Sequence, residues 1–82
     1  MPEIRVLLFD VLRREIGAGE VTVEVPAGAS GTDLLDRLAE AYAPVATHRP
    51  TIRLAVNLRY VPFETRIAEG DEVALITPVS GG

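Results

Sequence analysis

The chain has 82 residues and a formal net charge of −4, so it forms one small domain and lacks the basic face that nucleic-acid binding requires. The absence of cysteine excludes disulfides, thiolate nucleophiles and cysteine metal sites, and no other metal-ligand spacing is present. No apolar run approaches the roughly 18 to 20 residues of a membrane span, and no signal-peptide pattern opens the chain, which predicts a cytoplasmic protein.

Two strands and a helical turn are predicted for the first 25 residues. Residues 3–9 are short and apolar enough to form a strand, and residues 10–16 are expected to form a helical turn that Gly17 stops. Residues 20–25 alternate valine with Thr22 and Glu24, which is the pattern of a strand with one buried face.

A single amphipathic helix is predicted in the middle of the chain. Ser30 stands three residues before Asp33, a spacing typical of a helix start, because the serine hydroxyl accepts a hydrogen bond from the Asp33 amide. Apolar residues then recur at helical spacing until about Ala43, just before Pro44. One face of this helix is therefore expected to pack against the sheet.

The segment from Pro44 to Pro50 is interpreted as a loop. It contains His48, which is the single histidine of the chain and is expected to be a surface residue. No Ser/His/Asp set is plausible around this one histidine, so we expect no catalysis by this protein alone.

Three strands are predicted after this loop. The first begins at Thr51 with alternating apolar residues, a short one follows at residues 59–61, and the last covers residues 72–77 after a turn at residues 69–71. One helix packed on one face of a mixed sheet gives a two-layer α+β domain.

The alternation of the first and last strands predicts an exposed apolar patch. If the two strands are neighbours, Leu7, Phe9 and Ile76 point away from the helix together. A patch of this kind indicates a docking surface, and we favour a different protein as its partner. The alternatives are that residues 10–16 fold back over the patch or that a second copy covers it.

The chain ends in a diglycine, which is the segment expected to carry chemistry. We expect a domain at residues 1–77 and a flexible tail at residues 78–82, namely Pro78, Val79, Ser80, Gly81 and Gly82. Glycine has no Cβ, so such a tail fits a narrow slot and presents an unhindered carboxylate. Fully extended, the five residues reach about 17 Å.

Four segments together resemble the MoaD/ThiS family of sulfur carriers: residues 6–9, 54–57, 70–76 and 78–82. The most specific element is Gly-Asp-Glu-Val at residues 70–73, followed by Pro-Val-Ser-Gly-Gly at the end of the chain. Within the family, the resemblance is greatest to small subunits of molybdopterin synthase. Family members often have aromatic residues at the positions of Leu75 and Ile76 and a proline at that of Thr77.

The resemblance implies a ubiquitin-like β-grasp fold and a carrier cycle. A ubiquitin-activating-like adenylyltransferase (MoeB-like) uses ATP to adenylate the Gly82 carboxylate, and the carrier itself binds no cofactor. Sulfur from a persulfide donor then replaces AMP and leaves a thiocarboxylate. The tail enters the large subunit of molybdopterin synthase (MoaE-like) in a hetero-oligomer and gives its sulfur to a cyclic pyranopterin precursor, forming the molybdopterin dithiolene of the molybdenum cofactor.

Three other functions remain open at this point. A carrier for thiamine thiazole synthesis has the same fold, although such carriers are usually shorter. A ubiquitin-like covalent protein modifier passes through the same activated Gly82. A β-grasp interaction module with an inert tail requires no chemistry at all.

Overall fold

The computed structural model describes residues 2–78 and contains a mixed sheet of five strands. The strand order is β2-β1-β5-β3-β4, in which β1 and β5 are parallel and the other neighbours are antiparallel. Every strand predicted from the sequence is present, with bounds that differ by at most two residues. The strands are β1 (Glu3–Leu8), β2 (Glu20–Glu24), β3 (Arg53–Val56), β4 (Arg59–Val61) and β5 (Val73–Ile76).

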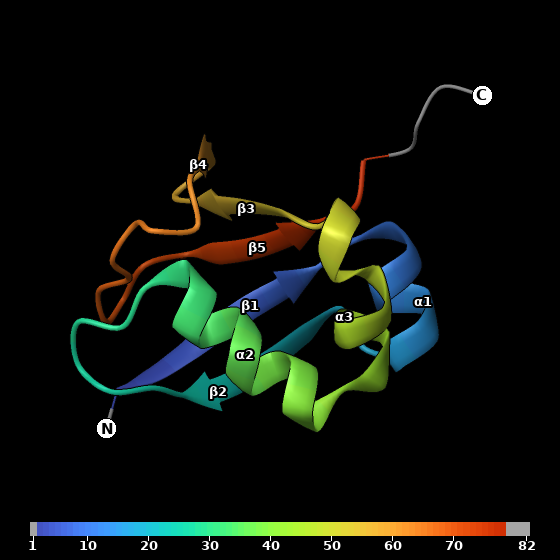
Figure 1. Ribbon diagram of the computed structural model, residues 1–82, viewed down its shortest axis with the longest axis horizontal. Helices are drawn as coiled ribbons and strands as arrows, with labels where there is room; N and C mark the ends of the chain where they lie inside the picture. Colours follow the sequence, from blue (N-terminus) through green and yellow to red (C-terminus); the bar gives the residue numbers. More distant parts are fainter. Residues whose placement is uncertain (1, 79–82) are drawn as a thin grey trace.

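Helices cover one face of this sheet (Figure 1). The helical elements are α1 (Asp10–Ile16), α2 (Gly31–Ala41), α3 (Ala43–His48) and the 3-10 turn η1 (Arg49–Thr51). In Figure 1, α2 and α3 lie over the sheet, and α1 lies beside α3 at the end where β1 finishes. The two-layer α+β architecture predicted from the element order is therefore confirmed.

The core lies between the helices and the helix-facing side chains of the strands. Ile4, Val6 and Leu8 of β1 are almost completely buried, as are Val73 and Leu75 of β5. These residues alternate with partly or fully exposed ones because successive side chains of a strand point to opposite faces. The alternation that identified the strands thus also decides which side chains reach the second, open face.

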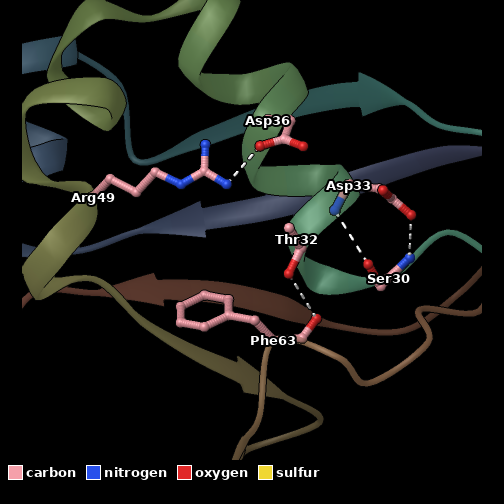
Figure 2. A network of polar contacts seen from close by, with 6 residues as sticks. All are labelled: Ser30, Thr32, Asp33, Asp36, Arg49 and Phe63. Atoms are coloured by element: carbon pink, nitrogen blue, oxygen red, sulfur yellow. Dashed lines mark hydrogen bonds and ion pairs between the residues drawn. The ribbon is translucent and has the colours of Figure 1, made fainter.

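The N-terminus of α2 is closed by a capping box (Figure 2). The Asp33 amide donates to the Ser30 hydroxyl at 3.2 Å, and the Ser30 amide donates to the Asp33 carboxylate at 3.0 Å. Both contacts satisfy amide groups that have no partner within the helix. The predicted helix start is confirmed, whereas the helix ends at Ala41, two residues earlier than expected.

The first turn of α2 is fixed against the segment that follows β4. The Thr32 hydroxyl donates to the carbonyl of Phe63 (Figure 2). The Thr32 amide donates to the same carbonyl, and the Gly31 amide donates to the carbonyl of Thr65. A Cβ on Gly31 would collide with the side chain of Leu54 and approach the Phe63 carbonyl oxygen to 3.0 Å. Glycine at position 31 is therefore what lets the helix lie this close to the sheet.

The loop predicted between Pro44 and Pro50 is wrong, because this segment forms α3 and η1. Each proline lies in the first turn of its helix, where a missing amide hydrogen costs no internal hydrogen bond. Val45 is completely buried and anchors α3 in the core. Packing has overridden the local signal of the two prolines.

Helix α1 ends as predicted, at Gly17, whose φ of 84° is in the left-handed region that glycine adopts without strain. Its Leu12 is completely buried and the helix contacts α3. Within residues 2–78, no helix has the length and apolar character needed to cross a membrane, and no three acidic or histidine side chains gather around a common metal position.

Candidate functional site

The open face of the sheet carries an apolar hollow in the region where a docking patch was predicted. β1 and β5 are neighbours, with Leu7 opposite Ala74, so the condition on which the patch depended is met. Leu7, Phe9 and Ile76 all line one hollow of about 210 Å³, and Phe9 keeps 41 % of its surface exposed. The remaining lining residues are Ala55, Leu58, Tyr60, Glu72 and Ala74.

Residues 10–16 do not cover this hollow. They form α1, which packs against α3 on the helical side, and none of its residues lines the hollow. One of the two alternative explanations for the patch, that the N-terminal turn folds back over it, is thereby excluded. Within residues 2–78, the hollow is open to another molecule.

Among the lining residues that were not predicted, Leu58 and Tyr60 are the two large exposed ones, and they keep 89 % and 67 % of their surface exposed. Leu58 lies at the tip of the β3–β4 hairpin, a turn of two residues in which Asn57 has a φ of 52° and Leu58 a φ of 69°. Such turns favour asparagine followed by glycine. A leucine at the second position was the signal in the sequence that could have indicated this site.

Asn57 holds the hairpin tip against the start of β5. Its side chain donates to the Asp71 carboxylate at 3.1 Å and accepts from the Glu72 amide at 3.0 Å, while its own amide donates to the Glu72 carbonyl at 2.8 Å. Asp71 also accepts from the Ala68 amide at 2.7 Å. The tip is therefore fixed by several hydrogen bonds at once, and Leu58 is presented from a rigid turn.

Charged side chains border the hollow on the side of β1 and β2. Arg5 and Glu20 form an exposed ion pair at 2.8 Å, and the side-chain hydrogen bond from Arg5 lowers the pKa of Glu20 from its ordinary value of 4.5. Together with Glu3, Asp71 and Glu72 they line a neighbouring hollow of about 270 Å³. The apolar hollow is thus bordered by a largely acidic hollow at the Glu72 end, whereas the exposed Arg53 stands opposite Ile76 at the other end.

The root of the predicted tail follows directly from β5. Thr77 is 7 % exposed, and its hydroxyl has no hydrogen-bond partner within the part of the chain that the structure describes. Pro78 is exposed and lies near Tyr60 and Phe63 in a third hollow. The other four predicted tail residues lie outside the described residues: Val79, Ser80, Gly81 and Gly82.

His48 lies on the helical side, away from the hollow. Its Nε2 is 2.9 Å from a carboxylate oxygen of Glu15, which joins α3 to α1. The structure therefore gives His48 a contact between two helices, and the prediction that it is a surface residue is confirmed only in part, because its side chain is 27 % exposed.

Curated relatives match the chain along nearly its whole length. A molybdopterin synthase sulfur carrier subunit from Arabidopsis thaliana is 34 % identical over 80 residues, which cover 98 % of this chain and 83 % of the relative. One from Chlamydomonas reinhardtii, with the same name, is 38 % identical over 82 residues, covering 98 % and 99 %.

Solved structures share the fold. SAMP1 from Haloferax volcanii has a TM-score of 0.82 at 31 % identity, covering 98 % of this chain and 99 % of its own. A putative molybdopterin converting factor subunit 1 from Pyrococcus furiosus has a TM-score of 0.84 at 25 % identity, covering 96 % and 100 %. A chain of the BexX/CysO complex from Amycolatopsis orientalis has a TM-score of 0.69 at 26 % identity, covering 96 % and 99 %.

These likenesses confirm the β-grasp, ubiquitin-like fold implied by the four sequence segments. They also agree with the family resemblance, since the relatives carry the name of a sulfur carrier subunit. The ThiS family model matches residues 6–82, which is almost the entire sequence. This chain therefore belongs to the ThiS family of β-grasp proteins.

Proposed function

We propose that this protein is the sulfur carrier subunit of a molybdopterin synthase. The observation that carries the proposal is the end-to-end match to curated relatives of that name at 34 % and 38 % identity. The apolar hollow supports it, because a subunit that delivers its C-terminus to another protein needs a surface on which that protein can dock. Ile76 lies in the hollow and is two residues from Pro78, where the tail begins.

Gly82 is the reacting residue in this proposal. ATP-dependent adenylation turns its carboxylate into an acyl adenylate, whose leaving group is AMP. Attack of a sulfur nucleophile on the acyl carbon expels AMP and leaves a thiocarboxylate. Gly81 allows close approach of an enzyme to the backbone, and the thiocarboxylate sulfur then passes to the pyranopterin precursor. The carrier supplies no catalytic side chain and needs no cofactor of its own.

Two protein partners follow from this chemistry, and both act in the cytoplasm. The first is an ATP-dependent adenylyltransferase of the ubiquitin-activating type (MoeB-like). The second is the large subunit of molybdopterin synthase (MoaE-like), with which the carrier forms a hetero-oligomer. Support comes from the likeness to a solved carrier chain in the BexX/CysO complex, in which a protein of this fold is bound to another protein.

The mass of the intact protein tests the carrier chemistry. The chain is incubated with ATP, sodium sulfide and the adenylyltransferase of the same organism, beside a variant that lacks Gly82. We expect a gain equal to one sulfur replacing one oxygen, in the intact chain alone. No gain, with an adenylyltransferase that is active on another carrier, would refute the proposal.

Charge substitutions on the open face test the docking surface separately. Phe9→Asp and Ile76→Asp place a carboxylate in the hollow, and we expect both to weaken binding to the large subunit while thermal unfolding changes little. Thr22→Asp is the matched control, because Thr22 is exposed on the neighbouring β2 and does not line the hollow. A large fall in melting temperature without loss of binding would show that Phe9 and Ile76 serve the core.

A second candidate function is covalent modification of other proteins. It is favoured by the likeness to SAMP1, the small archaeal modifier protein 1 of Haloferax volcanii, two solved structures of which share this fold at TM-scores of 0.82 and 0.83. In this case the acyl adenylate of Gly82 is attacked by a lysine amine instead of sulfur. Mass spectrometry of host extracts for Gly82–lysine isopeptides distinguishes the two functions.

A further inference from the structure

Four side chains stand directly opposite one another across the open face of the sheet. Leu7 on β1 is opposite Ala74 on β5, Ala74 is opposite Ala55 on β3, and Ala55 is opposite Tyr60 on β4. Neighbouring strands lie about 4.8 Å apart, so these four residues form a continuous row. Its two middle members are alanines and its two ends are large, which makes the row a trough with a floor of alanine.

The hollow of about 210 Å³ occupies this trough. Leu7 and Phe9 border the alanine floor on the side of β1, Leu58 and Tyr60 border it on the side of β4, and Ile76 closes it along β5. An apolar cavity of about 150 Å³ holds one benzene molecule in another protein. The trough therefore has room for one large side chain.

Leu58 is held in this wall at a cost to the isolated chain. Its φ of 69° lies in the left-handed region, which costs a residue with a Cβ about 1–2 kcal/mol. Because 89 % of its surface is exposed, the side chain recovers little by burial within the chain. The Asn57 hydrogen bonds maintain the turn all the same. An exposed leucine on a strained, rigid tip indicates a contact outside the chain.

We propose that this hollow is a socket for one bulky apolar side chain, aliphatic or aromatic, that projects from the large synthase subunit receiving the tail. The inference rests on the proposed function and adds the mode of docking. β5 contributes Ala74 to the floor and Ile76 to the wall, and its chain then passes to Pro78. A protein whose side chain enters the socket is thereby held at the root of the tail.

The border of the socket specifies what surrounds the inserted side chain. Glu72 lines the socket, and Glu20, Glu3 and Asp71 line the hollow beside it, where Arg5 already pairs with Glu20. Basic residues of the partner therefore complement the border at the Glu72 end, and an acidic residue complements Arg53, which stands opposite Ile76 at the other end. A central apolar anchor with a charged rim is the arrangement in which a few residues dominate the binding energy.

Filling the socket distinguishes it from a flat apolar contact. Ala74→Leu keeps the surface apolar but occupies the floor, and Ala41→Leu is the matched control at an exposed alanine on the helical side. Binding of each chain to the large subunit of the same organism is measured by titration calorimetry. We expect Ala74→Leu to weaken binding between about 5-fold and 150-fold, and the control to bind like the unsubstituted chain.

A second variant removes the wall instead of filling the floor. Leu58→Gly relieves the strained φ, so we expect it to remain folded and to bind more weakly than the unsubstituted chain. Thermal unfolding of each variant without partner shows whether the fold is intact, and Leu58→Gly decides the question if Ala74→Leu does not fold.

The outcomes separate the socket from the proposed function. Equal or tighter binding by Ala74→Leu, beside normal binding of the unsubstituted chain, refutes the socket and leaves the carrier function in place. If the unsubstituted chain forms the thiocarboxylate but does not bind the large subunit, the synthase assignment fails and the occupant of the socket with it. Self-association of the chain that Ala74→Leu abolishes would identify a second copy as the occupant and refute the proposal.

Discussion

Replacing Leu58 by glycine is expected to stabilise the isolated protein. The substitution removes about 1–2 kcal/mol of strain at a φ of 69°. Glycine also makes the unfolded chain more flexible, which offsets about 0.4–1 kcal/mol of that gain. Little burial is lost, because 89 % of the Leu58 surface is exposed. The expected net effect is a rise of about 0.5–1 kcal/mol in the free energy of unfolding, or about 2–8 °C in melting temperature for a chain of this size.

Urea unfolding followed by far-UV circular dichroism measures this change, since the chain has no tryptophan to report on unfolding. Leu58→Ala is the control. It removes most of the side chain but keeps a Cβ at the same φ, so we expect its free energy of unfolding to stay within about 0.5 kcal/mol of the original. A loss of more than about 0.5 kcal/mol in Leu58→Gly would show that Leu58 packs within the isolated chain, and the outward role argued for it would be refuted.

Three further substitutions test the fold and its pH dependence. Gly31→Ala should lower the free energy of unfolding by about 1–3 kcal/mol, because its Cβ meets Leu54 and the Phe63 backbone; an unchanged urea midpoint would contradict this close approach. Ser30→Ala should cost about 1 kcal/mol through loss of the capping box, again measured in urea, and a neutral result would mean that water replaces the hydroxyl. Glu20→Gln should lower the melting temperature slightly near neutral pH. The Arg5 hydrogen bond lowers the pKa of Glu20, so its contribution is present above pH 4.5 and is lost as the pH falls through the lowered pKa. A difference between Glu20→Gln and the unsubstituted chain that persists at about pH 2 would exclude this origin.

The strands and α2 were predictable because their signals are local. Alternating apolar residues identify a strand whatever its neighbours are, and the Ser30–Asp33 spacing identifies a helix start. The segment from Ala43 to Thr51 was not predictable in this way. Its helices form because Val45 is buried against the rest of the core. Pro44 and Pro50 locally favour a loop, and this preference is outweighed by packing that exists only in the folded chain.

Three large residues of the candidate site could be predicted from the sequence, whereas the role of its two alanines could not. Leu7, Phe9 and Ile76 followed from alternation once the first and last strands were taken as neighbours, and strand order and register are properties of the whole fold. Alternation also places Ala55 and Ala74 away from the helix, but it does not identify them as a floor, since an alanine in a strand becomes a floor only when its cross-strand neighbours are known.

The residues around the socket depart from local preference in opposite directions. Ala55 and Ala74 are small at the centre of the sheet, where β-branched or aromatic residues are favoured, and Leu58 is large at a turn position where glycine is favoured. Neither departure helps the isolated chain to fold. Both deepen the same hollow, one by lowering its floor and the other by raising its wall. Both the alanines and the leucine are unfavourable for the stability of the domain, and both make the hollow deeper. A side chain that enters the hollow therefore explains them better than the stability of the domain does.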